Sequence, residues 1–130
     1  MILRNILNIF KTRSPEKNIS YIVQCRENYF VGIYPSDENA KEKDGYKTLI
    51  QIAKSYFDKG FYEEFALYFM EGHYFIQLWT AHLILEYGQP TEELKMMCLD
   101  EIKKYANSTL SPDVALMEKQ WLEKYLKQRI

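Results

Sequence analysis

Few residues in this chain have the types and spacings that metal or thiol chemistry requires. His73 and His82 are nine residues apart, so on one straight helix they would point in opposite directions. Zinc-binding histidines usually lie three to five residues apart, so this pair predicts no metal centre. Cys25 and Cys98 are far apart and belong to no CxxC pattern, which predicts reduced thiols packed inside the protein.

The pair His82 and Glu86 is the closest approach to an acid–base constellation. The two residues are four apart in a strongly apolar segment, so on a helix their side chains can touch. We interpret them as a buried, hydrogen-bonded structural pair, and an unusual enzyme site around them remains an alternative. The chain contains no GxSxG, no phosphate-binding glycine loop and no GxGxxG pattern. We therefore expect no enzyme and no cofactor.

The charge pattern is the most informative feature. Residues 61–94 contain six glutamates and neither Lys nor Arg, which gives this stretch a net charge of −6. Such a stretch predicts an acidic face that attracts a basic partner and speeds its capture. The alternative is a solvated surface whose acids only stabilise the first turns of helices, which suits Glu63-Glu64 and Glu92-Glu93. The candidate partner-binding residues are Glu63, Glu64, Glu71 and Glu86, with Tyr62, Tyr68 and Tyr74 as aromatic anchors.

Composition fits one globular domain spanning residues 1–130. Hydrophobic residues make up 47% and charged residues 27% of the chain, an ordinary balance for a folded domain. The net charge of −1 argues against nucleic acid as a partner. Aromatic residues reach 15%, including 11 tyrosines, which suits either an interface or the boundary of a small core. We expect a cytoplasmic protein that is a monomer when free and spans no membrane.

The sequence of the first third of the chain fits more than one structure. Residues 1–13 form a short amphipathic pattern with a basic face, expected to dock on its own domain rather than on a membrane. Residues 16–34 fit a helix with Phe30 on its inner face and Gly32 as a blemish, or a hairpin of 21–25 against 29–34. We favour the helix. Residues 35–45 read as a polar loop.

The remaining segments predict helices with short connections. Apolar residues recur at helical spacing over 46–57, 62–69, 74–87, 94–105 and 114–125. The segment 74–87 is apolar on nearly every side, which predicts a central, surrounded helix. Thr91 is placed to cap the next helix, whose inner face includes Met97 and Cys98. We therefore expect an all-α, compact bundle of about five to seven short antiparallel helices, arranged either irregularly or in HEAT-like pairs.

Four segments follow one another in this chain: 74–88, 94–105, Val114-Ala115 and Trp121-Leu122. Together they resemble small all-helical immunity proteins of bacteria. These proteins serve contact-dependent growth inhibition and related polymorphic toxin systems, and the resemblance covers roughly residues 45–126. It implies that the partner is a cognate protein toxin domain, often a basic nuclease, which the chain neutralises by covering its active site. No catalytic residue is implied. The alternative is a small helical-repeat adaptor for an endogenous protein.

Overall fold

A computed structural model of the chain describes residues 15–128. The predicted amphipathic segment 1–13 lies outside the described residues. Every regular element within them is an α-helix or a 3-10 helix, and they contain no strand, which confirms the predicted all-α fold class. The elements are α2 (Pro15–Val31), η1 (Glu38–Ala40), α3 (Asp44–Phe57), α4 (Tyr62–Ala66), η2 (Leu67–Met70), α5 (Ile76–Tyr87), α6 (Glu92–Ala106) and α7 (Pro112–Gln128).

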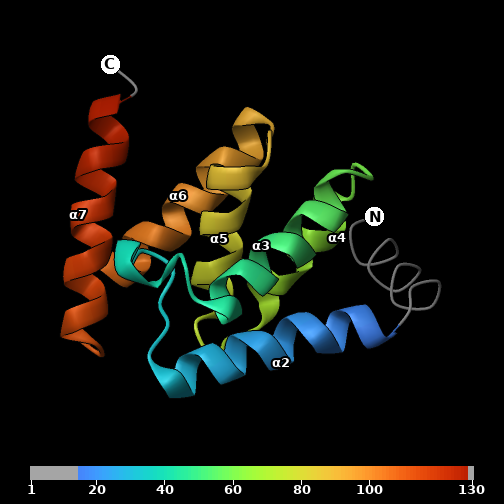
Figure 1. The fold of residues 1–130 in the computed structure, drawn as a ribbon. Coiled ribbons are helices and arrows are strands. Elements are labelled where there is room, and N and C mark those ends of the chain that lie inside the picture. The colour runs from blue at the N-terminus through green and yellow to red at the C-terminus, as the bar shows by residue number, and fades with distance from the viewer. Residues whose placement is uncertain (1–14, 129–130) are drawn as a thin grey trace.

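Helix α5 is the centre of the bundle. It packs against α2, α3, η2 and α6, and α7 packs against α6 (Figure 1). Eight of its residues are buried, and Leu78, Trp79 and Leu83 are among the largest fully buried side chains of the protein. A helix covered on so many sides has little need of a polar face. The prediction of a central helix is therefore confirmed, although the helix begins at Ile76 and not at Tyr74.

Helix α2 shows that the helix, and not the hairpin, was the correct prediction for residues 16–34. Gly32 has a φ of 77°, a conformation that glycine adopts without steric cost. The amide of Ile33 donates to the carbonyl of Asn28 at 2.9 Å, and that of Gly32 to the carbonyl of Tyr29 at 3.4 Å. This bond pattern is a Schellman motif, so Gly32 ends the helix and is no blemish within it. Phe30 is 71% exposed, so its expected place on the inner face was wrong.

The connections differ from the expected ones in detail. The polar loop 35–45 contains η1, and α3 already begins at Asp44. The hydroxyl oxygen of Thr91 accepts from the amide of Leu94 at 3.2 Å, which confirms the predicted cap of α6. Met97 is 48% exposed, contrary to its expected inward position, whereas Cys98 is fully buried. Both cysteines are free, buried thiols.

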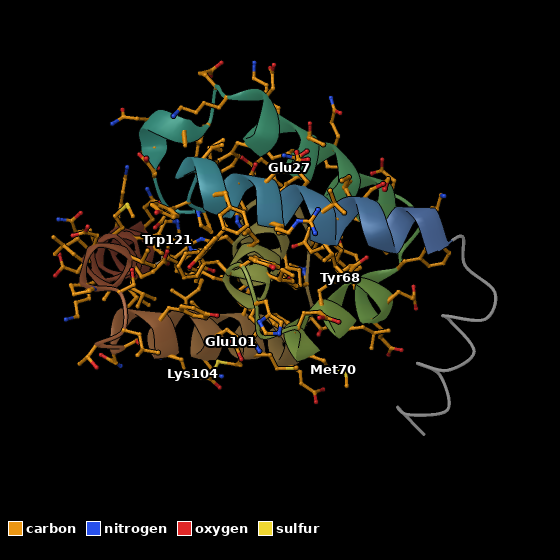
Figure 2. The ribbon with its side chains drawn as sticks, turned by 90° about the horizontal axis from the view of Figure 1, so that it is seen from below. Glu27, Tyr68, Met70, Glu101, Lys104 and Trp121 are labelled. Carbon is orange, nitrogen blue, oxygen red and sulfur yellow. The ribbon has the colours of Figure 1, made fainter. Side chains whose placement is uncertain are left out.

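Helix α7 and the start of α2 lie at opposite edges of the molecule in two perpendicular views (Figures 1 and 2). Trp121 lies on the side of α7 that faces the other helices (Figure 2). Its ring meets that of His82 edge to face, with centroids 4.5 Å apart, and stacks on the ring of Tyr125 at 4.8 Å. Among residues 15–128, no helix is both long and apolar enough to cross a membrane.

Candidate functional site

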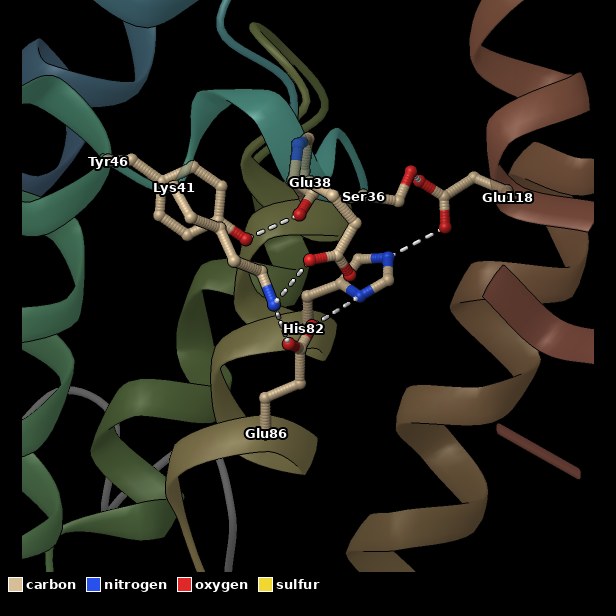
Figure 3. Close-up of polar contacts among 8 residues, drawn as sticks. Ser36, Glu38, Lys41, Tyr46, His82, Glu86 and Glu118 are labelled. Carbon is tan, nitrogen blue, oxygen red and sulfur yellow. Dashed lines mark hydrogen bonds and ion pairs between the residues drawn. The ribbon is translucent and has the colours of Figure 1, made fainter. Parts of the chain in front are cut away.

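His82 lies at the centre of a buried polar network that joins α5 to α7. Its Nε2 atom is 2.6 Å from Oε1 of Glu118, and its Nδ1 atom is 3.1 Å from Oε2 of Glu86 (Figure 3). His82 is 1% exposed and Glu118 is fully buried. Two carboxylates on one imidazole favour a protonated ring that donates from both nitrogens.

The loop between α2 and α3 completes the network. The Ser36 hydroxyl donates to Oε2 of Glu118 at 2.6 Å, so both oxygens of this buried carboxylate have partners. The Nζ atom of Lys41 lies 3.3 Å from Glu86 and 3.5 Å from Glu38. The network therefore ties the loop to α5 and α7, three segments that are distant in sequence (Figure 3).

The pKa values within the network favour its charged form. Burial lowers the pKa of His82, but the charge and hydrogen bond of Glu118, assisted by Glu86, outweigh burial and raise that pKa from 6.5 to about 9. Burial likewise raises the pKa of Glu86, but His82 and Lys41 outweigh it and hold that pKa below its usual value. The raised pKa of His82 and its two hydrogen bonds thus favour an imidazolium at this position at neutral pH.

This geometry fits a structural role better than catalysis. Both ring nitrogens of His82 are already occupied, and the ring is closed off from solvent by Trp121 on one side. A general base needs a free nitrogen within reach of a substrate proton. The predicted hydrogen bond between His82 and Glu86 is confirmed, with His82 buried and Glu86 half-buried. The described residues contain no group of His, Cys, Asp and Glu side chains able to hold a metal ion.

The network gives a pH-dependent stability. Because His82 binds its proton more tightly in the folded state, its contribution is complete below about pH 6.5 and is lost as the pH rises to about 9. We expect the free energy of unfolding to fall by about 3 kcal/mol over this range. Urea titrations at pH 6.5 and 9 measure the fall, and His82→Gln should show a much smaller one. Equal falls in both proteins would mean that His82 does not cause the dependence.

The sequence missed four members of this network, which are Ser36, Glu38, Lys41 and Glu118. Glu118 gave a usable signal, because it falls on the same helical stripe as Val114, Trp121 and Tyr125, where a buried acid requires a partner. Ser36 and Lys41 lie in a polar loop whose path the sequence did not reveal.

Two of the six glutamates in 61–94 have cationic partners from outside that range. Lys41 contacts Glu86 at 3.3 Å, and Lys95 contacts Glu92 at 3.1 Å. The absence of Lys and Arg within the stretch therefore did not reveal these two ion pairs. Glu63, Glu71 and Glu93 form no ion pair with any residue between 15 and 128 for which contacts are described.

The acids predicted to bind a partner lie near both ends of α5. These ends are about 18 Å apart, because the helix has 12 residues. Glu63 and the half-buried Glu64 lie beside the α5–α6 turn, because the neighbouring Tyr62 hydroxyl accepts from the amide of Gln89 at 2.8 Å. Glu71 lies toward the other end, next to the turn that precedes α5. The structure brings Glu63 and Glu64 together with Tyr62 but not with Glu71.

The three predicted tyrosine anchors have different surroundings. Tyr68 is 4% exposed, and its hydroxyl bonds to that of Tyr56 at 3.0 Å, so it belongs to the core. Tyr62 is half-buried and stacks on Phe57 with ring centroids 4.8 Å apart. Tyr74 is half-buried and lines a surface cavity. Tyr62 and Tyr74 are thus the predicted anchors with rings within reach of a partner.

No protein-family model, no curated protein and no solved structure matches this chain. The class of protein therefore follows from fold and surface alone: within residues 15–128 it is an all-helical bundle with a buried ionic network, exposed acids such as Glu63 and Glu93, and exposed aromatic rings.

Proposed function

We propose that this chain is an immunity protein, which binds a cognate toxin domain of basic, nuclease type and blocks it. The observation that carries the proposal is the group formed by Glu63, Glu64 and Tyr62 at the α5–α6 turn, which we name the acidic edge. Glu93, exposed in the first turn of α6, extends the acidic edge at the same turn.

The acidic edge offers what a basic partner needs. Nuclease surfaces are positively charged where they hold phosphates, and exposed acids such as Glu63 steer such surfaces into contact. Tyr62 is held in place by Phe57 and Gln89, so its ring loses little freedom on binding. A blocking protein needs no reactive group, which agrees with a His82 whose ring nitrogens are both occupied.

The direct test is to search the genes beside its own for one that encodes a toxin domain and to co-express that domain with this chain. We expect cells to survive with the chain and to die without it, and the two proteins to purify as one complex. Death in both cases, with no complex, would contradict the proposal. A stable complex with an endogenous protein instead would favour the adaptor alternative.

Charge reversal at the acidic edge tests the contact itself. Glu63→Lys should slow association with the toxin domain several-fold at low salt and change dissociation little, because exposed charges act mainly on the encounter. Stopped-flow binding at several salt concentrations measures both rates. Glu123→Lys, which reverses an exposed acid on α7, is the matched control and should leave the rate near that of the wild type. Equal rates for all three proteins at every salt concentration would exclude the acidic edge.

A further inference from the structure

A cavity of about 420 Å³ opens at the end of α5 opposite to the acidic edge. It lies between the end of α2, the turn before α5 and the α6–α7 connection. Its walls include the rings of Tyr29, Tyr74, Phe75 and Tyr105. Cavities of this volume accommodate a long side chain together with part of its backbone. We name it the aromatic pocket.

The rings of the aromatic pocket support one another. Tyr29 contacts Tyr74 and Phe75 with centroids 5.7 and 5.3 Å away, and Phe75 contacts Tyr105 at 5.9 Å. The Tyr105 hydroxyl donates to the side-chain oxygen of Gln77 at 3.2 Å, which fixes that ring. At the rim, Leu110 is 94% exposed. The pocket is therefore a preformed aromatic surface that is open to a ligand.

The backbone that supplies two of these rings is strained. Tyr74 and Phe75 have φ values of 54° and 56°, a left-handed conformation that bulky residues rarely adopt. Such residues cost on the order of 1–3 kcal/mol each and gather at binding and active sites. The packed rings hold this strained turn in place, so the aromatic side chains that it presents are fixed before any ligand binds.

The charges around the aromatic pocket favour a cation. Among the described residues, no Lys or Arg lines it, and His73 is the one basic side chain in its lining. Glu71 directly precedes the lining residue Gly72 and has no described ion pair, and the exposed Asp113 lies between the lining residues Ser111 and Val114. Aromatic faces attract cations through their ring quadrupole, most strongly when the flanking charge is also negative.

We propose that the aromatic pocket receives an arginine side chain of the protein partner. Arginine fits better than lysine because its planar, weakly hydrated guanidinium stacks on aromatic rings. Its three methylene groups would lie against the apolar rim at Leu110. This inference rests on the proposed function only in taking the partner to be a basic protein.

The test uses the full chain and short peptides, so it requires no toxin. Acetyl-Gly-Arg-Gly-amide should shift the ring NMR signals of the pocket tyrosines saturably, with a Kd on the order of 1 mM. The peptide with citrulline, a neutral analogue of the same shape, should bind at least about fivefold more weakly because it lacks the charge. Equal binding of the two peptides, or no saturable shift with either, would overturn the proposal.

Two variants separate binding from folding. Tyr74→Asn removes a ring while keeping a residue that tolerates the left-handed conformation, so the thermal midpoint should hold while arginine binding falls at least about fivefold. Glu123→Gln, an exposed acid on α7 nine residues beyond the lining residue Val114, should leave peptide binding unchanged. Unweakened binding in Tyr74→Asn would exclude the aromatic pocket. Failure of the peptides with continued protection against a toxin would reject this inference and leave the proposed function intact.

Discussion

Replacing Glu118 with alanine is expected to lower the free energy of unfolding by about 3–5 kcal/mol. Glu118 is fully buried and holds both the ring of His82 at 2.6 Å and the hydroxyl of Ser36 at 2.6 Å. Its removal leaves an imidazolium that has only Glu86 as a partner, together with an unsatisfied hydroxyl. Breaking one side of a buried ion pair is costly because the remaining charge stays desolvated. Urea denaturation at pH 6.5, where His82 is protonated in the folded state, measures the loss.

Two further variants distinguish loss of charge from loss of volume. Glu118→Gln keeps the side-chain shape and one acceptor oxygen, so it should cost clearly less than Glu118→Ala. His82→Gln and Glu118→Gln should be non-additive by 1 kcal/mol or more, as about 0.5–3 kcal/mol is usual for residues in one network. Strict additivity of these two variants would show that the residues do not act as a pair. A loss below about 1 kcal/mol in Glu118→Ala would contradict its burial.

The helices were predictable because their signals are local. Helical spacing of apolar residues, the Thr91 cap and the apolar surface of α5 all act within one turn or one helix. The start of α5 was misjudged because Tyr74 and Phe75 continue the apolar pattern while their backbone is left-handed. No propensity predicts that conformation for two aromatic residues, since only packing against Tyr29 and Tyr105 can hold it.

The candidate sites were predictable only in part, for the same physical reason. His82 and Glu86 are one helical turn apart, so their contact follows from the sequence. Glu118 lies 36 residues from His82, and Lys41 lies 45 from Glu86, so these contacts depend on how helices and loop pack. The same packing brings Lys41 to an acidic stretch that has no cation of its own. Charge patterns along a chain therefore overstate the charge of the folded surface.

Replacing Trp79 with alanine should have an equally large effect, about 3–5 kcal/mol of unfolding free energy. Trp79 is 1% exposed on the central helix, and its ring meets that of Tyr46 edge to face at 4.9 Å. Tyr46 in turn donates a hydrogen bond to the carbonyl of Pro35, in the loop that the ionic network also holds. The alanine variant thus leaves a large cavity between α5 and α3 and loosens one support of that loop. Thermal or urea denaturation measures the cost.

Trp79→Phe separates the effect of the indole N–H group from the effect of the ring volume. Within the described part of the chain, the Nε1–H group of Trp79 is buried and has no hydrogen-bond partner, which itself costs stability. Phenylalanine removes this unpaired donor and keeps most of the ring, so we expect a loss well below that of alanine, about 1–2 kcal/mol. Leu110→Ala, at a residue that is 94% exposed, should change stability by less than about 0.5 kcal/mol. If Trp79→Ala cost no more than Leu110→Ala, α5 would not be the centre of the core. If Trp79→Phe cost as much as Trp79→Ala, the Nε1–H group would have a partner, such as a buried water, that stabilises the fold.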